Sequence, residues 1–210
     1  MIEKYLSVSC GLITQKVIEK SKIITTSRHV ESEEEARAFI AEISKKYSDA
    51  THNCYAYIPD IQGNIPRFSD DGEPQGTAGM PMLEVLKNKN LVQTAVVVTR
   101  YFGGVKLGAG GLVRAYSGCV AENVETAQKA LYETCAELEI SCGYSSVDAA
   151  ERYFNENSVD ILNTEYADEV VFKVAVRKKG KESFDKELIN RLNGNVKIIF
   201  KREYFFPFKV

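Results

Sequence analysis

The chain has 210 residues, of which 44% are hydrophobic and 27% are charged, and its formal net charge is −2. This composition is typical of a soluble globular protein, and the length suits two domains of ordinary size. The slight negative charge excludes a protein that coats nucleic acid by bulk attraction, so any nucleic-acid contact must come from a local basic patch. No apolar run approaches the roughly 20 residues that a membrane-spanning helix needs. Since the first residues also lack the long apolar region of a signal peptide, we expect a cytoplasmic protein without membrane contact.

In the first half of the chain, the predicted elements begin with a strand over Glu19–Arg28, where β-branched residues are frequent. Ser32 and Glu35 then form a capping box, in which each side chain bonds the backbone of the other residue. The helix that follows has apolar residues at helical spacing as far as Tyr47. Asn53–Pro59 is a predicted strand that leads into a glycine-rich block.

Three further elements are predicted around the glycine-rich part of the chain. Pro81 suits the first turn of a short helix, because a helix start does not use the N–H that proline lacks. Leu91–Tyr101 is a continuous apolar run that predicts a buried strand and ends at a pair of glycines. Beyond them, apolar residues from Leu112 to Leu131 recur every three or four positions, which predicts a long amphipathic helix that begins inside the glycine-rich loop.

After Glu133 the pattern changes, and six elements follow in the order β-α-β-β-α-β. They are an alternating strand to Cys142, a helix capped by Ser145 or Ser146, strands over Val159–Thr164 and Val170–Arg177, a helix that stops at Gly194, and a strand around Val196–Phe200. This order is that of a ferredoxin-like fold. We therefore predict an α+β protein with a first domain at residues 1–132 and a smaller ferredoxin-like domain at residues 133–210.

The five cysteines are odd in number, no two have CxxC spacing, and the chain has only two histidines. A metal site is therefore not expected, and no cofactor is predicted. Cys119 lies on an apolar helical stripe and Cys142 in an alternating strand, so we predict buried, free thiols at both positions.

Two glycine-rich blocks, Phe68–Pro81 and Val96–Ser117, hold most of the glycines, and nine of the 14 fall between Gly72 and Gly118. Glycine allows positive φ angles and close backbone approach at a cost in conformational entropy. Such a concentration predicts a built surface, where function should be sought.

The second block has the parts of an anion site: a strand, a flexible loop and a helix N-terminus whose unpaired amides attract negative charge. Arg100, Lys106 and Arg114 add positive charge. The glycines of this candidate anion- or nucleic-acid-binding site are Gly103, Gly104, Gly108, Gly110 and Gly111. Neither a phosphate-loop motif nor a dinucleotide-binding motif matches the spacing. The alternative is that the glycines only permit tight packing of strand and helix. The sequence favours neither interpretation over the other.

The first block carries three carboxylates, at Asp70, Asp71 and Glu73, which suit a hard cation or acid–base chemistry. We favour turn chemistry instead, since the short polar side chains of Ser-Asp-Asp-Gly commonly bond local backbone. His52 lies near these blocks in the sequence, and histidine is a common general base at neutral pH. A hydrogen-bonded structural histidine is the more frequent case, so no catalytic residue is predicted.

In the second half, Arg177, Lys178 and Lys179 form a basic turn, and the aromatic stretch Tyr204–Phe206 adds rings. Exposed aromatic side chains on a ferredoxin-like sheet can stack on RNA bases. The alternative is a solvated hairpin tip, because the aromatic signatures of RNA-binding sheets are absent from this sequence.

Four segments together resemble the IMPACT family, in particular its bacterial YigZ branch: Lys20–Ile24, Ala50–Tyr57 and the two glycine-rich blocks. The resemblance implies a first domain folded like the second domain of ribosomal protein S5, and a second domain similar to domain V of elongation factor G. Both of those relatives contact ribosomal RNA or the ribosome. Eukaryotic members of the family are implied to modulate translation during amino-acid starvation, by competing for an activator of a stress kinase.

We therefore predict a translation-associated regulatory protein that binds RNA or the ribosome, acts in a stress response and is not an enzyme. The alternative is a hydrolase or transferase for a phosphorylated small molecule, with the anion on the Gly103–Gly111 loop and His52, Asp70 or Asp71 as base or metal ligand. A third hypothesis is a docking module for a protein partner in translation control. The sequence leaves the oligomeric state open.

Overall fold

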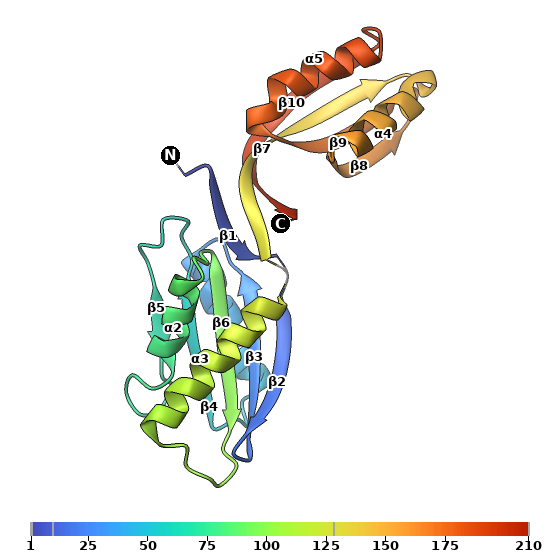
Figure 1. Cartoon of the computed structure of the whole chain (residues 1–210). Coiled ribbons are helices and arrows are strands. Elements are labelled where there is room, and N and C mark those ends of the chain that lie inside the picture. The colour runs from blue at the N-terminus through green and yellow to red at the C-terminus, as the bar shows by residue number, and fades with distance from the viewer. Residues whose placement is uncertain (1, 10, 128, 210) are drawn as a thin grey trace. The chain divides into compact units, whose positions relative to one another are not determined.

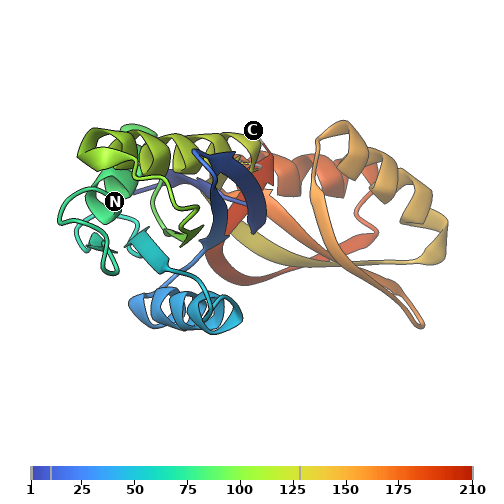
Figure 2. The ribbon, with the colours of Figure 1, turned by 90° about the horizontal axis from the view of Figure 1, so that it is seen from below.

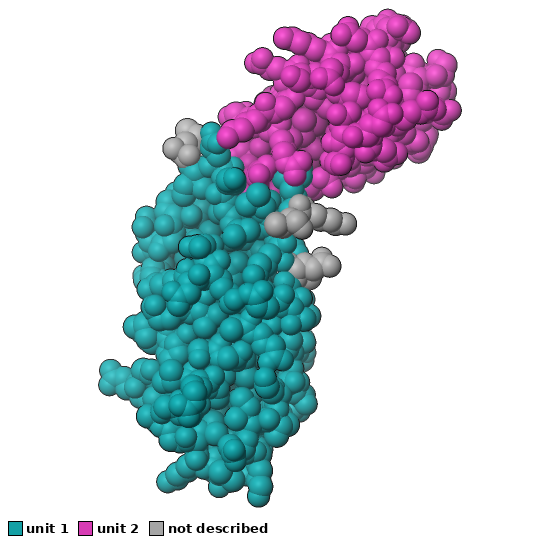
Figure 3. Space-filling view, viewed as in Figure 1, with its two compact units in different colours: residues 1–131, 207–210 teal, residues 132–206 magenta. Residues whose placement is uncertain are grey.

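The computed structural model describes residues 2–9, 11–127 and 129–209. The chain divides into two compact units, of residues 1–131 with 207–210 and of residues 132–206 (Figures 1 and 3). Each unit has a hydrophobic core of its own, as protein domains do.

Unit 1 is built on a five-stranded sheet with helices on both faces. Its strands, in the order in which they pair, are β2 (Leu12–Ile18), β3 (Ser21–His29), β6 (Thr94–Tyr101), β4 (His52–Ile58) and β5 (Arg67–Ser69), and all neighbours are antiparallel. The other elements of this unit are β1 (Lys4–Val8), α1 (Glu33–Lys46), α2 (Gly79–Asn88) and α3 (Gly108–Thr126). Figure 2 shows α3 on one side of the sheet and α1 on the other.

Strand β6 shows how the sheet comes to be covered on both faces. Val96 and Val98 belong to the core formed with α2 and α3, whereas Ala95 and Val97 belong to the core formed with α1. Because successive side chains of a strand point to opposite faces, a strand covered on both sides is apolar along its covered middle, here Ala95–Val98. This explains the continuous apolar run in the sequence, and burial of each such valine contributes about 1.5–3 kcal/mol.

Helix α1 begins at the predicted capping box, with one difference. The Glu35 N–H donates to Ser32 Oγ at 3.1 Å, as predicted. The Glu35 carboxylate, however, accepts from the N–H of Glu31 at 2.7 Å, one residue earlier than the box predicts. The side chain therefore still bonds the backbone that enters the helix, and it fixes the helix start.

The first predicted strand begins at Ser21 instead of Glu19, because Glu19 and Lys20 form a turn. Both residues have positive φ angles, of 45° and 65°. Two such residues in a row are typical of the tight turn between antiparallel strands, here β2 and β3. The sequence patterns above do not predict β1, β2 or β5. The turn between β2 and β3 lacks the usual Asn or Gly, and β2 exposes apolar side chains. Strand β5 has only three residues.

Unit 2 has the predicted ferredoxin-like order. Its elements are β7 (Lys129–Cys142), α4 (Val147–Glu156), β8 (Asp160–Tyr166), β9 (Val170–Arg177), α5 (Lys181–Arg191) and β10 (Val196–Lys209), with short 3-10 turns at Tyr144–Ser146 and Lys178–Gly180. Strand β7 pairs with β9 and with β10, and β9 pairs with β8. Helices α4 and α5 pack on one face of this sheet (Figure 2), where Phe154, Phe172 and Leu188 belong to the core.

Of three details of the predicted elements, two need correction and one is confirmed. Helix α3 ends at Thr126, and Leu131, which the pattern places in that helix, lies in β7. Ser146 precedes α4, but its side chain makes no capping hydrogen bond. Gly194 ends α5 as predicted, with a φ angle of 78° and its N–H bonded to the Ile189 carbonyl.

The thiols of Cys119 and Cys142 are buried and free, as predicted, and so are those of Cys54 and Cys135. Cys10 lies outside the described residues. Burial raises the pKa of the Cys119 thiol to about 11, so this thiol stays protonated at neutral pH. Among the described residues, no helix is both long and apolar enough to span a membrane.

Candidate anion-binding surface

The loop after β6 lies against the turn between β2 and β3, near the lower end of unit 1 in Figure 1. Gly103 allows this contact, because a Cβ atom at this position would lie 2.0 Å from the carbonyl oxygen of Lys20. Only glycine fits where two backbones approach so closely. The contact places Lys20 and Lys22 beside the loop that leads into α3.

We call five exposed side chains around this contact the glycine–basic surface. They are Lys20, Lys22, Phe102, Lys106 and Arg114. Phe102 is 46% exposed, and Lys22 Nζ lies 5.6 Å from the ring centre of Tyr101. Glu19 belongs to the same turn as Lys20, so the surface is mainly basic with one acidic side chain at its margin. Basic side chains beside an exposed aromatic ring are a typical setting for nucleic-acid contact.

Lys106 and Arg114 flank the start of α3 and are available to a ligand. Within the described ranges, neither side chain has a hydrogen bond or an ion pair. The guanidinium of Arg114 lies back over the first helical turn, where Nη1 would be 3.6 Å from a Cβ atom at Gly110. Helix α3 starts with neither a side-chain cap nor an acidic residue in its first turn. The first amides of the helix and two cations therefore face solvent together.

The glycines of the two blocks form two groups, one that packs tightly and one that leaves backbone accessible. Gly79 and Gly103 permit tight packing, since a Cβ atom at Gly79 would lie 2.7 Å from the carbonyl oxygen of a β5 residue. Gly104 and Gly108 have positive φ angles, of 84° and 69°, with open space around them. The glycines that leave backbone exposed or half-buried around the start of α3 are Gly104, Gly108, Gly110 and Gly111. Packing and an accessible backbone are thus combined in one block.

The structure separates Arg100 from the two cations with which the sequence groups it. Arg100 is 4% exposed, and its Nη1 donates to Glu73 Oε1 at 2.6 Å. Its Nη2 donates to Ser21 Oγ at 3.2 Å. Because a buried guanidinium needs an acidic partner, Glu73 and not an external anion neutralises Arg100. We call Arg100, Glu73, Ser21 and the two residues that join them, Tyr116 and Cys54, the Glu73 cluster.

Tyr116 and Cys54 complete the Glu73 cluster from α3 and β4. The Tyr116 hydroxyl donates to Glu73 Oε1 at 2.8 Å. Cys54 Sγ lies 3.4 Å from this hydroxyl and donates to the Asp70 carbonyl oxygen at 2.9 Å. Burial raises the pKa of Tyr116 far above its usual range and that of the Cys54 thiol to about 12. Both groups stay protonated at neutral pH, so neither is a ready nucleophile.

His52 lies at the rim of the Glu73 cluster. Its Nδ1 is 2.7 Å from the carbonyl oxygen of Asp71, which can only accept, so Nδ1 carries the hydrogen. Its Nε2 faces Glu73 Oε2 at 3.9 Å. These contacts favour the interpretation of His52 as a hydrogen-bonded structural residue, and they leave Nε2 as the atom that any acid–base chemistry would use.

The carboxylates of Asp70 and Asp71 both bond backbone amides. Asp70 accepts from Ala78 and Gly79 at 3.0 and 2.8 Å and from Gly76 at 2.8 Å. Burial raises the pKa of Asp70, but these three backbone donors outweigh burial and the pKa is lowered overall. Asp71 accepts from the Asn53 N–H at 2.6 Å. The geometry favours turn chemistry, and no described group of three or more His, Cys, Asp or Glu is arranged to hold a metal ion.

The basic turn of unit 2 has acidic partners. Arg177 Nε lies 2.9 Å from Glu133, and Lys178 Nζ lies 2.7 Å from Glu203. Lys179, in the same 3-10 turn, is exposed. The sheet continues this pattern, because Lys201 pairs with Glu139, Arg202 with Glu137 and Lys173 with Glu165. Paired charges leave a weaker field for a nucleic acid than the free cations at the start of α3.

Sequence reasoning did not single out Lys20, Lys22 or Phe102 as site residues. The topology brings them there, since β3 pairs with β6 so that Lys22 lies opposite Tyr101. Lys20 reaches the surface because it occupies the turn that Gly103 contacts. The only sequence signal for the two lysines is the Lys20-Ser21-Lys22 segment, which has a lysine at each end.

These observations define a two-domain α+β protein with a candidate anion-binding surface on its first unit and a ferredoxin-like second unit. The family model for the Impact N-terminal domain matches residues 19–124. A model described as Domain of unknown function (DUF1949) matches residues 140–195. The chain belongs to the IMPACT family, and the family suggests a regulatory role.

Bacterial relatives are similar over most of the chain. IMPACT family member YvyE of Bacillus subtilis (strain 168) is 39% identical over 194 residues, which cover 92% of this chain and 89% of that protein. IMPACT family member YigZ of Escherichia coli (strain K12) is 31% identical over 201 residues, which cover 94% and 98%. Protein IMPACT of Oryctolagus cuniculus is 41% identical over 68 residues, only 31% of this chain and 21% of that protein. Both units are thus shared with the bacterial proteins.

A solved structure described as "Crystal structure of an hypothetical protein" has the same fold. It is 30% identical, has a TM-score of 0.62, and covers 96% of this chain and 99% of that chain.

Proposed function

We propose that this chain is a regulatory protein of translation that binds RNA, including ribosomal RNA, through the glycine–basic surface and without catalysing a reaction. The observation that supports this most directly is the start of α3, where Lys106 and Arg114 are exposed, without an ion pair among the described residues, beside a helix N-terminus that has no side-chain cap. Backbone amides at a helix start and flanking cations are the groups that bind phosphate. Membership of the IMPACT family is consistent with a regulatory role in translation.

The other members of the surface suit a single-stranded or looped RNA. Lys20 and Lys22 extend the positive charge along the β2–β3 turn, so a phosphate backbone can contact more than one cation. Phe102 is 46% exposed and offers a ring on which a base can stack. The paired cations of unit 2, by contrast, make a smaller contribution in this proposal.

The test is co-sedimentation of the protein with purified ribosomes and with total RNA over a series of salt concentrations. The variant Lys106→Glu/Arg114→Glu should lose binding at all but the lowest salt. Loss of two phosphate contacts should also reduce the slope of log affinity against log salt by roughly 1.4 for single-stranded RNA. The matched control is Arg177→Glu/Lys178→Glu, which makes the same change in charge on the paired cations of unit 2.

The control should bind nearly as well as the wild-type protein. A wild-type protein that does not sediment with RNA or ribosomes even at low salt would rule the proposal out. An equal loss in both double variants would place binding on the overall charge and not on the glycine–basic surface.

A second candidate function has one observation in its favour. The Asp71 carbonyl orients His52 so that Nε2 faces Glu73 Oε2 at 3.9 Å, which places an imidazole nitrogen and a carboxylate together at the rim of the Glu73 cluster, although too far apart for a direct hydrogen bond. The alternative is therefore a hydrolase or transferase of a phosphorylated small molecule that binds at the start of α3. Turnover of phosphate esters, with and without divalent cations, that disappears in His52→Gln would support it. No turnover and no ligand-induced thermal shift would exclude it.

A further inference from the structure

Strand β2 forms an edge of the unit 1 sheet, and its outer side is free of any partner strand among the described residues. The strand has seven residues and pairs with β3 without a break, from Leu12 opposite Ser27 to Ile18 opposite Ser21. Its outer N–H and C=O groups are a template for another strand. Proteins usually protect such an edge with a proline, a bulge or an outward charge, and β2 contains neither proline nor bulge.

Two apolar side chains of β2 are exposed on one face. Ile13 is 52% exposed and Val17 is 65% exposed, and Gln15 lies between them on the same face because strand side chains alternate. Exposed apolar side chains on a free edge are the residues that a further strand would cover. The edge therefore has both unpaired backbone and uncovered apolar area.

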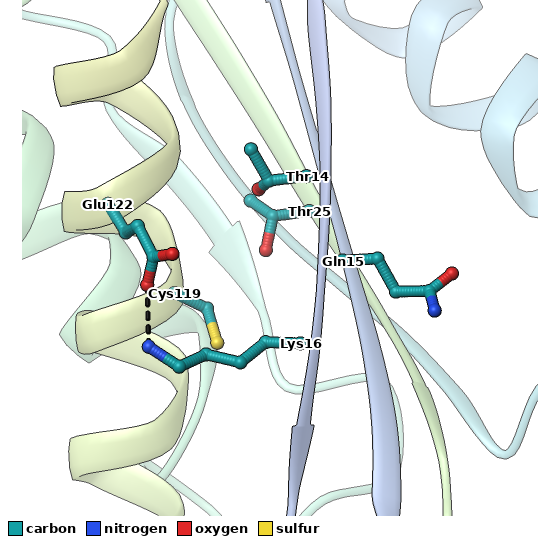
Figure 4. A pocket seen from close by; sticks show the side chains of 6 residues that line it. All are labelled: Thr14, Gln15, Lys16, Thr25, Cys119 and Glu122. Carbon is teal, nitrogen blue, oxygen red and sulfur yellow. Dashed lines mark hydrogen bonds and ion pairs between the residues drawn. The ribbon is translucent and has the colours of Figure 1, made fainter.

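The one charged residue of β2 does not guard this edge. Lys16 Nζ lies 2.6 Å from Glu122 Oε2 of α3. Figure 4 shows Lys16 extending toward α3, whereas Gln15 extends away from it. Lys16, Thr14 and Glu122 line a shallow depression between β2 and α3 together with Gln15, Thr25 and Cys119. The lysine is thus used within unit 1 and its charge is balanced.

We propose that β2 pairs with β2 of a second copy of this chain, in an antiparallel arrangement whose two-fold axis passes through Gln15. Gln15 is the central residue of the seven-residue strand, so each of the seven residues lies opposite a residue of the second copy. A two-fold axis makes neighbouring edges antiparallel, and two five-stranded sheets then become one continuous sheet. The proposal is independent of RNA binding by the glycine–basic surface.

The sequence of β2 is complementary to itself in this register. Ile13 lies opposite Val17 of the second copy, and Gln15 lies opposite Gln15. On the other face, Lys16 lies opposite Thr14 of the second copy, next to the depression that also contains Glu122. Apolar residues thus meet apolar residues, and each lysine approaches a carboxylate and not another lysine. An axis through Lys16 would place the two lysines opposite each other, which disfavours that register.

The expected dimer is weak. A pair of seven-residue strands buries less than the roughly 1,200–2,000 Å² of a standard stable interface. We therefore expect a concentration-dependent equilibrium between monomer and dimer.

The first test is site-specific disulfide formation in a Cys10→Ser background of the full chain. Gln15→Cys should form an intermolecular disulfide on mild oxidation, since paired residues at the axis have Cα atoms within the roughly 4.4–6.8 Å that a disulfide requires. Ile13→Cys alone and Val17→Cys alone should not, because equivalent residues four positions apart in register are separated by roughly 13 Å. A mixture of Ile13→Cys with Val17→Cys should give the mixed disulfide. Cross-linking of Ile13→Cys to itself, or no cross-link by Gln15→Cys, would overturn the proposal.

The second test is sedimentation equilibrium of the wild-type protein over a wide range of concentrations. Wild type should approach twice the monomer mass, and Ile13→Lys/Val17→Lys should remain monomeric. The matched control is Ile161→Lys/Leu162→Lys, which changes two apolar residues that are each 41% exposed on β8, an edge strand of unit 2. The control should dimerise like wild type. A wild-type protein that is monomeric at every concentration, or a dimer that the β8 control also abolishes, would contradict pairing through β2.

Discussion

The glycine–basic surface and the Glu73 cluster both take residues from the second glycine-rich block, yet they use charge in opposite ways. On the surface, Lys106 and Arg114 are exposed and make no ion pair within the described ranges. In the cluster, Arg100 is buried and bonded to Glu73 at 2.6 Å. The three cations lie within 15 residues of one another in the sequence, so proximity in the chain does not decide which of them can meet a ligand.

Position in the fold explains this difference. Arg100 lies in β6 with neighbours on both sides, opposite Ile23 of β3 and His52 of β4. Its side chain is enclosed by contacts with Glu73 and Ser21, and a buried charge requires a buried partner. Lys106 lies in the loop before α3 and Arg114 in the exposed side of its second turn, where water solvates the charge. The comparison predicts that the stability of the fold depends on Arg100, and that ligand binding depends on Lys106 and Arg114.

The largest expected effect is that of removing the buried cation. Arg100→Met leaves the Glu73 carboxylate buried without its cation, which should lower the free energy of unfolding by about 3–5 kcal/mol. The matched control, Lys106→Met, removes an exposed cation and should change this free energy by less than about 0.5 kcal/mol. Urea denaturation followed by circular dichroism measures both. Equal effects of the two substitutions would mean that Glu73 and Arg100 do not form the pair described.

A smaller effect is expected at the glycine that holds the surface together. Gly103→Ala places a Cβ atom where the Lys20 carbonyl oxygen is 2.0 Å away, so the β2–β3 turn must move. We expect a loss of about 1–3 kcal/mol in the free energy of unfolding. RNA binding should also weaken, since Lys20 and Lys22 move away from Phe102.

The control for Gly103→Ala is a glycine without close neighbours. Gly118 lies within α3, and a Cβ atom there would meet nothing within 4 Å. Gly118→Ala should therefore stabilise the protein by about 0.5–1 kcal/mol, because alanine is the better helix former. Thermal and urea denaturation of the two variants give the comparison. If Gly103→Ala left the free energy of unfolding unchanged, this result would show that the β2–β3 turn and the loop after β6 are not in contact.

Much of the fold follows from sequence patterns that are local. The capping of α1 by Ser32 depends on residues three positions apart, and β6 depends on a run of apolar residues in one strand. The ferredoxin-like order of unit 2 follows from alternating and helical periods read one after another. These features are determined within single elements, which is why periodicity and capping predict them.

The parts that the sequence did not predict depend on contacts between distant segments. Glu73 and Arg100 are 27 residues apart, and only the pairing of β4 with β6 and the path of the loop before α2 bring them together. The place of Lys20 on the surface depends on a turn whose positive φ angles are adopted by Glu19 and Lys20 in place of glycine or asparagine. Clustered glycines indicate the region of the candidate surface, but they do not indicate which of its cations are exposed.

The comparison of buried and exposed charge extends to a histidine outside both regions. His29 Nδ1 lies 2.8 Å from Ser7 Oγ, and Nε2 lies 3.6 Å from Glu31 Oε1. Burial lowers the pKa of His29 below its ordinary value of 6.5, although Glu31 acts in the opposite direction. The folded protein therefore favours the neutral imidazole, and between its lowered pKa and pH 6.5 the unfolded chain binds more protons.

The free energy of unfolding should consequently fall as the pH falls from 7 through 6.5 to the folded-state pKa, and this contribution should be constant above 7. His29→Gln keeps a polar side chain without the titration, so its stability should depend less on pH over the same range. Urea denaturation of both proteins at several pH values between 5 and 8 measures the difference in their free energies of unfolding. The contributions of carboxylates that titrate in both proteins cancel in this difference. Parallel pH profiles would show that His29 is as free to take up a proton in the folded state as in the unfolded chain. A steeper profile for wild type would show that burial sets the charge of His29, in contrast to the exposed positions of Lys106 and Arg114.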